Sequence, residues 1–276
     1  MAVVIGLVVG LILGLTGAGG STLAVPLLMW TLGLSLTQAA PLSLSAISCA
    51  ATIGAAIAWR QARLRYRAGL LMGGLGLLAA PIGVALAQHT PPKILELLFA
   101  GVMTVVALRM LLQARRSPDD ARTVRANIGD PAADDGALPC RVNPDTGRIH
   151  WTLRCTSALA AIGAGTGFLS GLLGVGGGFV VVPGLRASSD LSMPAAVATS
   201  LMVMAIISGG TAAMHFAHGG ALLSRIGLWF AGGAIVGMLA GTLLAPRVAG
   251  AKLQQAFGIT MLLAAALMAA KALGVG

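Results

Sequence analysis

The residues of this chain best suited to chemistry lie in two matching glycine-rich motifs. Residues 14–26 read GLTGAGGSTLAVP, and residues 171–183 read GLLGVGGGFVVVP. Because glycine permits positive φ and close approach of other groups, each motif predicts a broken helix that starts again. The new start presents free N–H groups and a positive dipole end, which bind an anion without a charged side chain. Ser21 and Thr22 add hydroxyl donors at the first start, whereas Gly178 offers only backbone at the second.

Further hydroxyls accompany both motifs. Ser43 and Ser200 correspond when the two motifs are aligned, and Thr199 is adjacent to Ser200. We predict that they line the same cavity, although Ser and Thr in membrane helices usually bond to their own backbone. The alternative for the glycines is close packing of helices through small residues. The predicted anion contacts are Gly19, Gly20, Ser21, Thr22, Ser43, Gly176, Gly177, Gly178, Thr199 and Ser200.

His215 is a second type of candidate, because the apolar part of the chain has few other titratable groups. An intramembrane histidine can relay protons, so proton coupling is a candidate role for it. It falls at the end of its apolar stretch, however, which favours an interfacial position.

The three cysteines, Cys49, Cys140 and Cys155, have neither metal-ligand spacing nor the even count of a disulfide framework. We expect Cys49 and Cys155 to be small apolar residues within helices. The sequence indicates no metal and no cofactor.

The elements that must position these residues are membrane helices. Of 276 residues, 57% are hydrophobic and only 9% are charged, far below the charged content of soluble domains. The net charge of +10 comes from basic residues at the ends of apolar runs, which are orientation signals rather than a nucleic-acid surface. Six stretches are long enough to cross a bilayer as single helices: 41–59, 68–87, 94–112, 194–215, 226–245 and 253–270.

The predicted fold class is an all-α, polytopic transmembrane helical bundle of two homologous repeats, each opening with a glycine-broken helix. Residues 1–113 form the first repeat, residues 114–153 a polar linker and residues 154–276 the second repeat. The pieces of each broken segment are predicted to be too short to span comfortably alone. If each broken segment crosses once, the halves are parallel; if each is a re-entrant hairpin, the halves are inverted. The charges fit both.

Basic residues predict the orientation of the first half. Arg60, Arg63, Arg65 and Arg67 crowd one loop, which favours a cytoplasmic position for residues 60–67. Two helices later, the linker at 114–153 reaches the same side. Its end, residues 140–151, contains the turn sequence Pro-Asp-Thr-Gly and predicts a small hairpin. The chain is therefore expected to be a multi-pass membrane protein with both of these segments on the cytoplasmic side.

The paired motifs ending in Val-Pro, each followed by a small-residue helix with Leu-Ser or Thr-Ser-Leu, resemble the TauE/SafE sulfite-exporter family. The Asn-Pro-Asp-Thr-Gly-Arg stretch of the linker is similar to that family as well. The resemblance implies a carrier for small sulfur-containing anions, such as sulfite, sulfoacetate or related organosulfonates. It further implies that this carrier is a polytopic protein of the inner membrane. We expect export, because an inside-negative potential drives anions outward, and alternating access about the interface of the two repeats.

Two other classes of function remain besides a carrier. An enzyme is disfavoured because no recognisable nucleophile motif is present. A non-transporting scaffold or regulator acting through residues 114–153 is the alternative to a carrier. The expected partners are a small anionic substrate and the lipid bilayer, with no nucleic acid; the sequence leaves the oligomeric state open.

Overall fold

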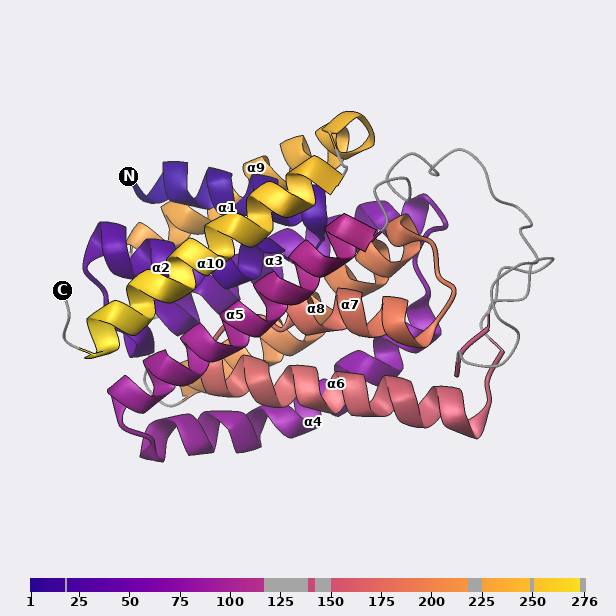
Figure 1. The fold of residues 1–276 in the computed structure, drawn as a ribbon, viewed down its shortest axis with the longest axis horizontal. Helices are drawn as coiled ribbons and strands as arrows, with labels where there is room; N and C mark the ends of the chain where they lie inside the picture. Colours follow the sequence, from indigo (N-terminus) through magenta and orange to yellow (C-terminus); the bar gives the residue numbers. More distant parts are fainter. Residues whose placement is uncertain (18, 117–138, 142–149, 218–224, 249–250, 274–276) are drawn as a thin grey trace.

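The computed structural model describes residues 1–17, 19–116, 139–141, 150–217, 225–248 and 251–273 (Figure 1). Within these ranges the chain forms ten helices and no strand, which confirms the all-α class. The helices are α1 (Ala2–Thr16), α2 (Gly19–Leu32), α3 (Leu36–Arg60), α4 (Tyr66–His89), α5 (Pro92–Arg116), α6 (Leu153–Leu173), α7 (Gly178–Ser188), α8 (Met193–Ala217), α9 (Arg225–Val248) and α10 (Ala251–Leu273).

Each of the six stretches predicted to cross the bilayer lies within one helix: α3, α4, α5, α8, α9 or α10. Among the described residues, five helices, namely α3, α4, α6, α8 and α9, are long and apolar enough to span a membrane. Large apolar side chains such as Leu78 and Leu243 point outward, with 73% and 77% of their surface exposed. Such a surface suits lipid rather than water as the solvent.

The glycine motifs break their helices as predicted. Gly17 follows α1 with φ 70°, and its N–H donates to Leu13 O at 2.7 Å. Gly174 follows α6 with φ 71°, and its N–H donates to Ser170 O at 2.8 Å. Both are left-handed glycine caps that end a helix. The predicted shortness of the pieces is wrong for α6, which at 21 residues is long enough to span alone.

The major helix pairings join the first half of the chain to the second. The most extensive contacts are α1 with α9, α4 with α6, α5 with α10, and α3 with α8. Figure 1 shows α4 and α6 side by side along one edge and α1 with α9 along the opposite edge. The two halves therefore interlock around one core. The predicted boundaries of the halves and of the linker are not tested by this packing and stay predictions.

Small residues bring the backbones of these pairs together and define their directions. In the pairs α1 with α9 and α4 with α6, successive contacts are four residues apart on both helices. The contacts follow in the same order along both chains, so the paired helices are parallel. Gly6, Gly10 and Gly14 of α1 lie against Phe230, Ala234 and Met238 of α9, while Gly163, Gly167 and Gly171 of α6 lie against Met72, Gly76 and Ala80 of α4.

The central pair runs the other way. Ser48 of α3 donates to Ala205 O of α8 at 3.3 Å, and Gly54, later in α3, lies against the earlier residue Leu201. Helices α3 and α8 are therefore antiparallel. Gly54 also lies against Met238, which places the second half of α9 beside the first half of α8.

These contacts fix the direction of each element that corresponds between the halves. Helix α8 is parallel to α4, because Gly69 meets Met202 and Gly73 meets Ile206. Helix α9 is antiparallel to α8, because the stretch from Ala217 to Arg225 can span at most about 29 Å while Met238, later in α9, lies beside the first half of α8. Helices α1, α3 and α9 therefore run in one direction, and α4, α6 and α8 in the opposite direction. Corresponding elements of the two glycine-opened segments (α1 and α6, α3 and α8, α4 and α9) have opposite directions.

The end of the linker is attached to the bundle by a disulfide. Cys140 and Cys155 are bonded, with Cα atoms 4.7 Å apart, and Cys140 N–H donates to Ser188 O at 2.9 Å. The expectation that Cys155 is only an apolar filler is wrong, because a pairing between a linker residue and a helix residue cannot be recognised from spacing. Cys49 is a free cysteine and is exposed. The predicted hairpin lies mostly outside the described residues, although His150 N–H donates to Arg141 O at 2.8 Å.

Candidate anion site at the helix breaks

The N-terminal ends of α2 and α7 meet near the middle of the antiparallel pair α3 and α8. A Cβ atom built on Gly176 would lie 2.8 Å from Ser208 Oγ of α8, 3.3 Å from Ile47 Cγ2 of α3 and 3.6 Å from Ser21 Cβ of α2. Three helices, α2, α3 and α8, thus converge on this glycine, which precedes α7. Ser21 and Gly176, which sequence reasoning assigned to one site from different halves, are brought together.

The electrostatics of this region favour a negative ligand. The buried polar side chains in the described part of the chain are all serine or threonine, with no carboxylate and no lysine or arginine among them. The first turns of α2 and α7 contribute N–H groups that have no partner within their own helix, and a partial positive charge. Hydroxyl and amide donors around a positive potential suit an oxyanion.

The remaining glycines of the motifs serve close packing around this point. Gly177 has φ 70°, and a side chain there would overlap Thr166 of α6. Gly178 leaves the space that the sulfur of Met204 occupies, and Gly20 lies against the backbone of α1 at Val9. Gly19 is the first residue of α2. These positions hold the two helix ends in place.

Ser43 and Ser200 hold the two breaks from opposite halves. Ser43 Oγ lies 2.9 Å from Gly174 O and 2.8 Å from Ala40 O of its own helix. Ser200 Oγ lies 2.9 Å from Gly17 O and 2.8 Å from Val197 O. Each hydroxyl proton is directed to carbonyl oxygens, so both side chains fix the breaks across the interface between the halves.

Three predicted residues lie apart from the meeting point. Thr22 Oγ1 contacts Met261 Sδ of α10 at 3.7 Å. Thr199 donates to Ala195 O at 2.8 Å and accepts from the main-chain N–H of Arg65 at 3.3 Å, which places it at the loop joining α3 and α4. His215 lies half-buried in the last turn of α8.

Sequence reasoning missed Ser208 as a member of this site. A single serine within an apolar helix gives no signal of its own, and Ala51 stands at the corresponding position of the first half. Ser208 could have been predicted from its spacing of eight residues from Ser200, because this spacing places both hydroxyls on similar faces of α8.

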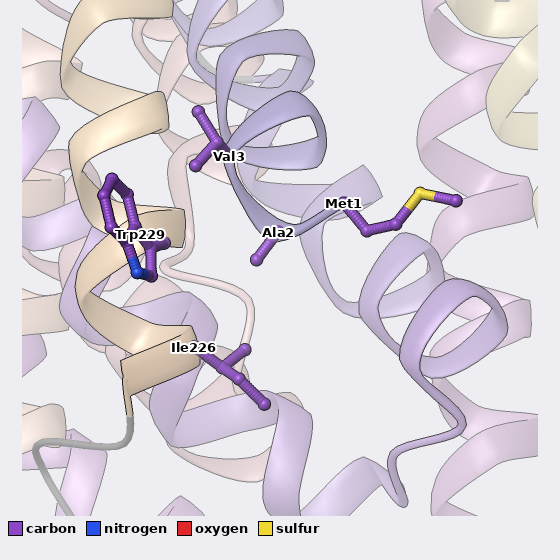
Figure 2. Close-up of a pocket in the computed structure, with 5 residues that line it drawn as sticks. All are labelled: Met1, Ala2, Val3, Ile226 and Trp229. Carbon is purple, nitrogen blue, oxygen red and sulfur yellow. The ribbon is translucent and has the colours of Figure 1, made fainter.

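A hollow of about 310 Å³ lies far from the glycine breaks, at the start of α1 and the start of α9. Figure 2 shows that its lining is apolar, formed by Met1, Ala2, Val3, Ile226 and Trp229. None of its lining side chains is charged, and it has the character of a lipid-facing surface.

The fold and site together define a multi-pass helical membrane protein with paired broken helices at its centre. The sequence model of the family "Sulfite exporter TauE/SafE" matches residues 2–268, and the chain belongs to this family, as its motifs predicted. Membrane transport is the function that this membership supports.

Curated relatives agree with this assignment. A "Probable membrane transporter protein" of Xylella fastidiosa (strain 9a5c) is 30% identical over 260 residues, covering 92% of this chain and 88% of the relative. The "Probable membrane transporter protein YdhB" of Bacillus subtilis (strain 168) is 23% identical over 201 residues, covering 73% and 72%. No solved structure matches the chain significantly.

Proposed function

We propose that this protein carries small sulfur-containing oxyanions, such as sulfite, sulfoacetate or related organosulfonates, out of the cell across the inner membrane. The observation that carries the proposal is the meeting of the α2 and α7 N-termini at Gly176 and Ser21, between the two halves of the chain. Broken helices that point their N-termini at a substrate near the bilayer midplane are the device by which many secondary transporters bind anions.

The donors of this site suit transport as well as binding. A buried lysine or arginine would hold an anion strongly and slow its release. Hydroxyls and helix ends bind more weakly, and they replace the hydration shell of the ion reversibly. Because a sulfite or sulfonate group has several acceptor oxygens on one sulfur, it can accept hydrogen bonds from several elements at once.

The opposite directions of corresponding helices support alternating access. Of the two arrangements that the sequence leaves open, an inverted pair of halves accounts for α1 running against α6 and α3 running against α8. In an inverted pair, one half can adopt the conformation of the other, which exposes the site first to one side and then to the other. We assign this mechanism to the chain.

The direction of transport follows from charge. An inside-negative potential drives an anion outward by about 2.3 kcal/mol per charge per 100 mV, so export requires no coupled proton. We place the basic loop at residues 60–67 and the linker on the cytoplasmic side, according to the distribution of arginine. His215, in the last turn of α8, is then close to the opposite side.

The test is charge movement in proteoliposomes to which sulfite, sulfoacetate, sulfate or chloride is added. We expect currents for the sulfur oxyanions that carry one sulfite or sulfonate group, and a reduced current in Ser21→Ala. The matched control is Thr104→Val, because Thr104 is half-buried in α5 and donates to Ala100 O at 2.8 Å within its own helix. Folded wild-type protein that moves none of these anions, in either a current or a tracer assay, would refute the proposed function.

A further inference from the structure

Two buried serines from the second half of the chain flank the turn between Gly176 and Gly177. Ser208 of α8 and Ser170 of α6 are both 0% exposed. Ser208 Oγ would lie 2.8 Å from a Cβ on Gly176, and Ser170 Cβ would lie 3.6 Å from a Cβ on Gly177. The two serine side chains therefore lie beside consecutive residues of the segment that leads into α7.

The hydroxyls of these serines have no hydrogen-bond partner among the described residues. This is unusual in this molecule, because most other described hydroxyls of its helices donate to a carbonyl three or four residues earlier. Thr166, one turn before Ser170, donates to Ile162 O at 2.6 Å, and Thr211, one turn after Ser208, donates to Ile207 O at 2.7 Å. An unsatisfied buried hydroxyl destabilises a fold, so each such group needs an explanation.

The surroundings favour an anion over a structural water as the missing partner. A neutral water gains little from a positive potential, whereas the N-terminal turn of α7 supplies N–H donors together with the positive end of the helix dipole, which stabilise a negative charge. The two serines add two more possible donors beside the same turn. A group with several acceptor oxygens and a negative charge satisfies all of them together.

We propose that Ser208 and Ser170 bind the three-oxygen sulfur head, sulfite or sulfonate, of the transported anion. This inference rests on the proposed function and names further specificity-determining residues of the same site. The two serines correspond to Ala51 and Leu13 in the first half of the chain, so their hydroxyls come from one half only. The head of the anion is therefore held mainly by the α6–α7–α8 side, and Ser21 approaches from the other half.

The test compares Ser208→Ala with Thr211→Val in proteoliposomes that carry sulfoacetate. Both residues lie on α8 and are 0% exposed, but the Thr211 hydroxyl is used within its own helix. Loss of a hydrogen bond to a charged group is expected to raise the half-saturating sulfoacetate concentration about tenfold in Ser208→Ala. Thr211→Val should transport with the wild-type half-saturating concentration. Ser170→Ala should behave like Ser208→Ala.

Equilibrium binding separates the site from the rate of transport. Calorimetric titration of the purified protein with sulfoacetate should give the same tenfold ratio of dissociation constants between Ser208→Ala and wild type, with unchanged thermal unfolding. Equal half-saturating concentrations and equal dissociation constants in Ser208→Ala and wild type would overturn this inference while leaving the carrier function standing. A wild-type protein that neither binds nor moves sulfoacetate or sulfite would overturn the proposed function, and this inference with it.

Discussion

The close approach of α4 and α6 can be tested with two glycines of the same helix. A Cβ on Gly167 would overlap the backbone of Gly76 in α4, whereas a Cβ on Gly165 would meet nothing within 4 Å. Alanine favours a helix interior over glycine by about 1 kcal/mol, and this gain applies equally at both positions. The two substitutions therefore differ in one respect, the contact with α4.

The loss of stability expected for Gly167→Ala depends on which atoms must move to make room for the new Cβ. At Gly167 the obstacle is backbone, so no rotamer change can relieve the overlap and the two helices must separate. Overpacking of this kind costs about 1–3 kcal/mol. Gly165→Ala should be slightly more stable than wild type, and Gly167→Ala should be less stable than Gly165→Ala by that amount. For chains of this size, 1 kcal/mol shifts Tm by about 2–4 °C, so the two variants should differ by about 2–12 °C.

The assay is thermal unfolding of the purified variants in detergent, followed by tryptophan fluorescence. Wild-type protein in the same detergent is the reference for both variants. If Gly167→Ala unfolds at the same temperature as Gly165→Ala, then α4 and α6 are not in backbone contact. The parallel alignment of these helices, and the direction assigned to α6 from it, would then be wrong.

Three further predictions concern the breaks, the disulfide and the linker. Gly33→Ala should lower the free energy of unfolding by about 1–2 kcal/mol, because of the left-handed φ of Gly33 alone. Gly174→Ala should lower it further, because the new Cβ would also overlap Ala40. Equal Tm values for the two variants would contradict the packing at this break. If the arginine-rich loop is cytoplasmic, Cys140 and Cys155 should be alkylated as thiols in growing cells and bonded only after purification in air; a disulfide trapped in cells would contradict the orientation. Deletion of residues 117–138 should leave sulfoacetate flux intact, whereas complete loss of flux from folded protein would favour the scaffold alternative.

Much of the fold could be predicted because membrane helices can be recognised from the local sequence. Uninterrupted apolar length located six helices, and the glycine motifs located the breaks before α2 and α7. The motifs also predicted that residues far apart in sequence, such as Ser21 and Gly176, approach one another. This prediction was possible because the unpaired backbone N–H and C=O groups of a broken helix inside a membrane must form hydrogen bonds with other protein groups or with a ligand. Two matching breaks are therefore expected to lie close together.

The rest depends on placement that the sequence does not encode locally. Ser208 and Thr211 are both hydroxyl residues of α8, yet only packing determines which of them bonds to its own helix and which does not. The disulfide between Cys140 and Cys155 depends on the return of the linker to the start of α6, which spacing does not reveal. Helix directions required contacts between the halves, because the charges fitted both arrangements.

The most direct test of the central claim is an experimental structure of the protein with sulfoacetate bound. We predict density for the sulfonate group where α2 meets α7, within hydrogen-bond distance of the Ser208 and Ser170 hydroxyls and beside Ser21. Density for the anion only elsewhere, for example at the loop where Arg65 meets Thr199, would contradict the claim that the paired helix breaks form the substrate site.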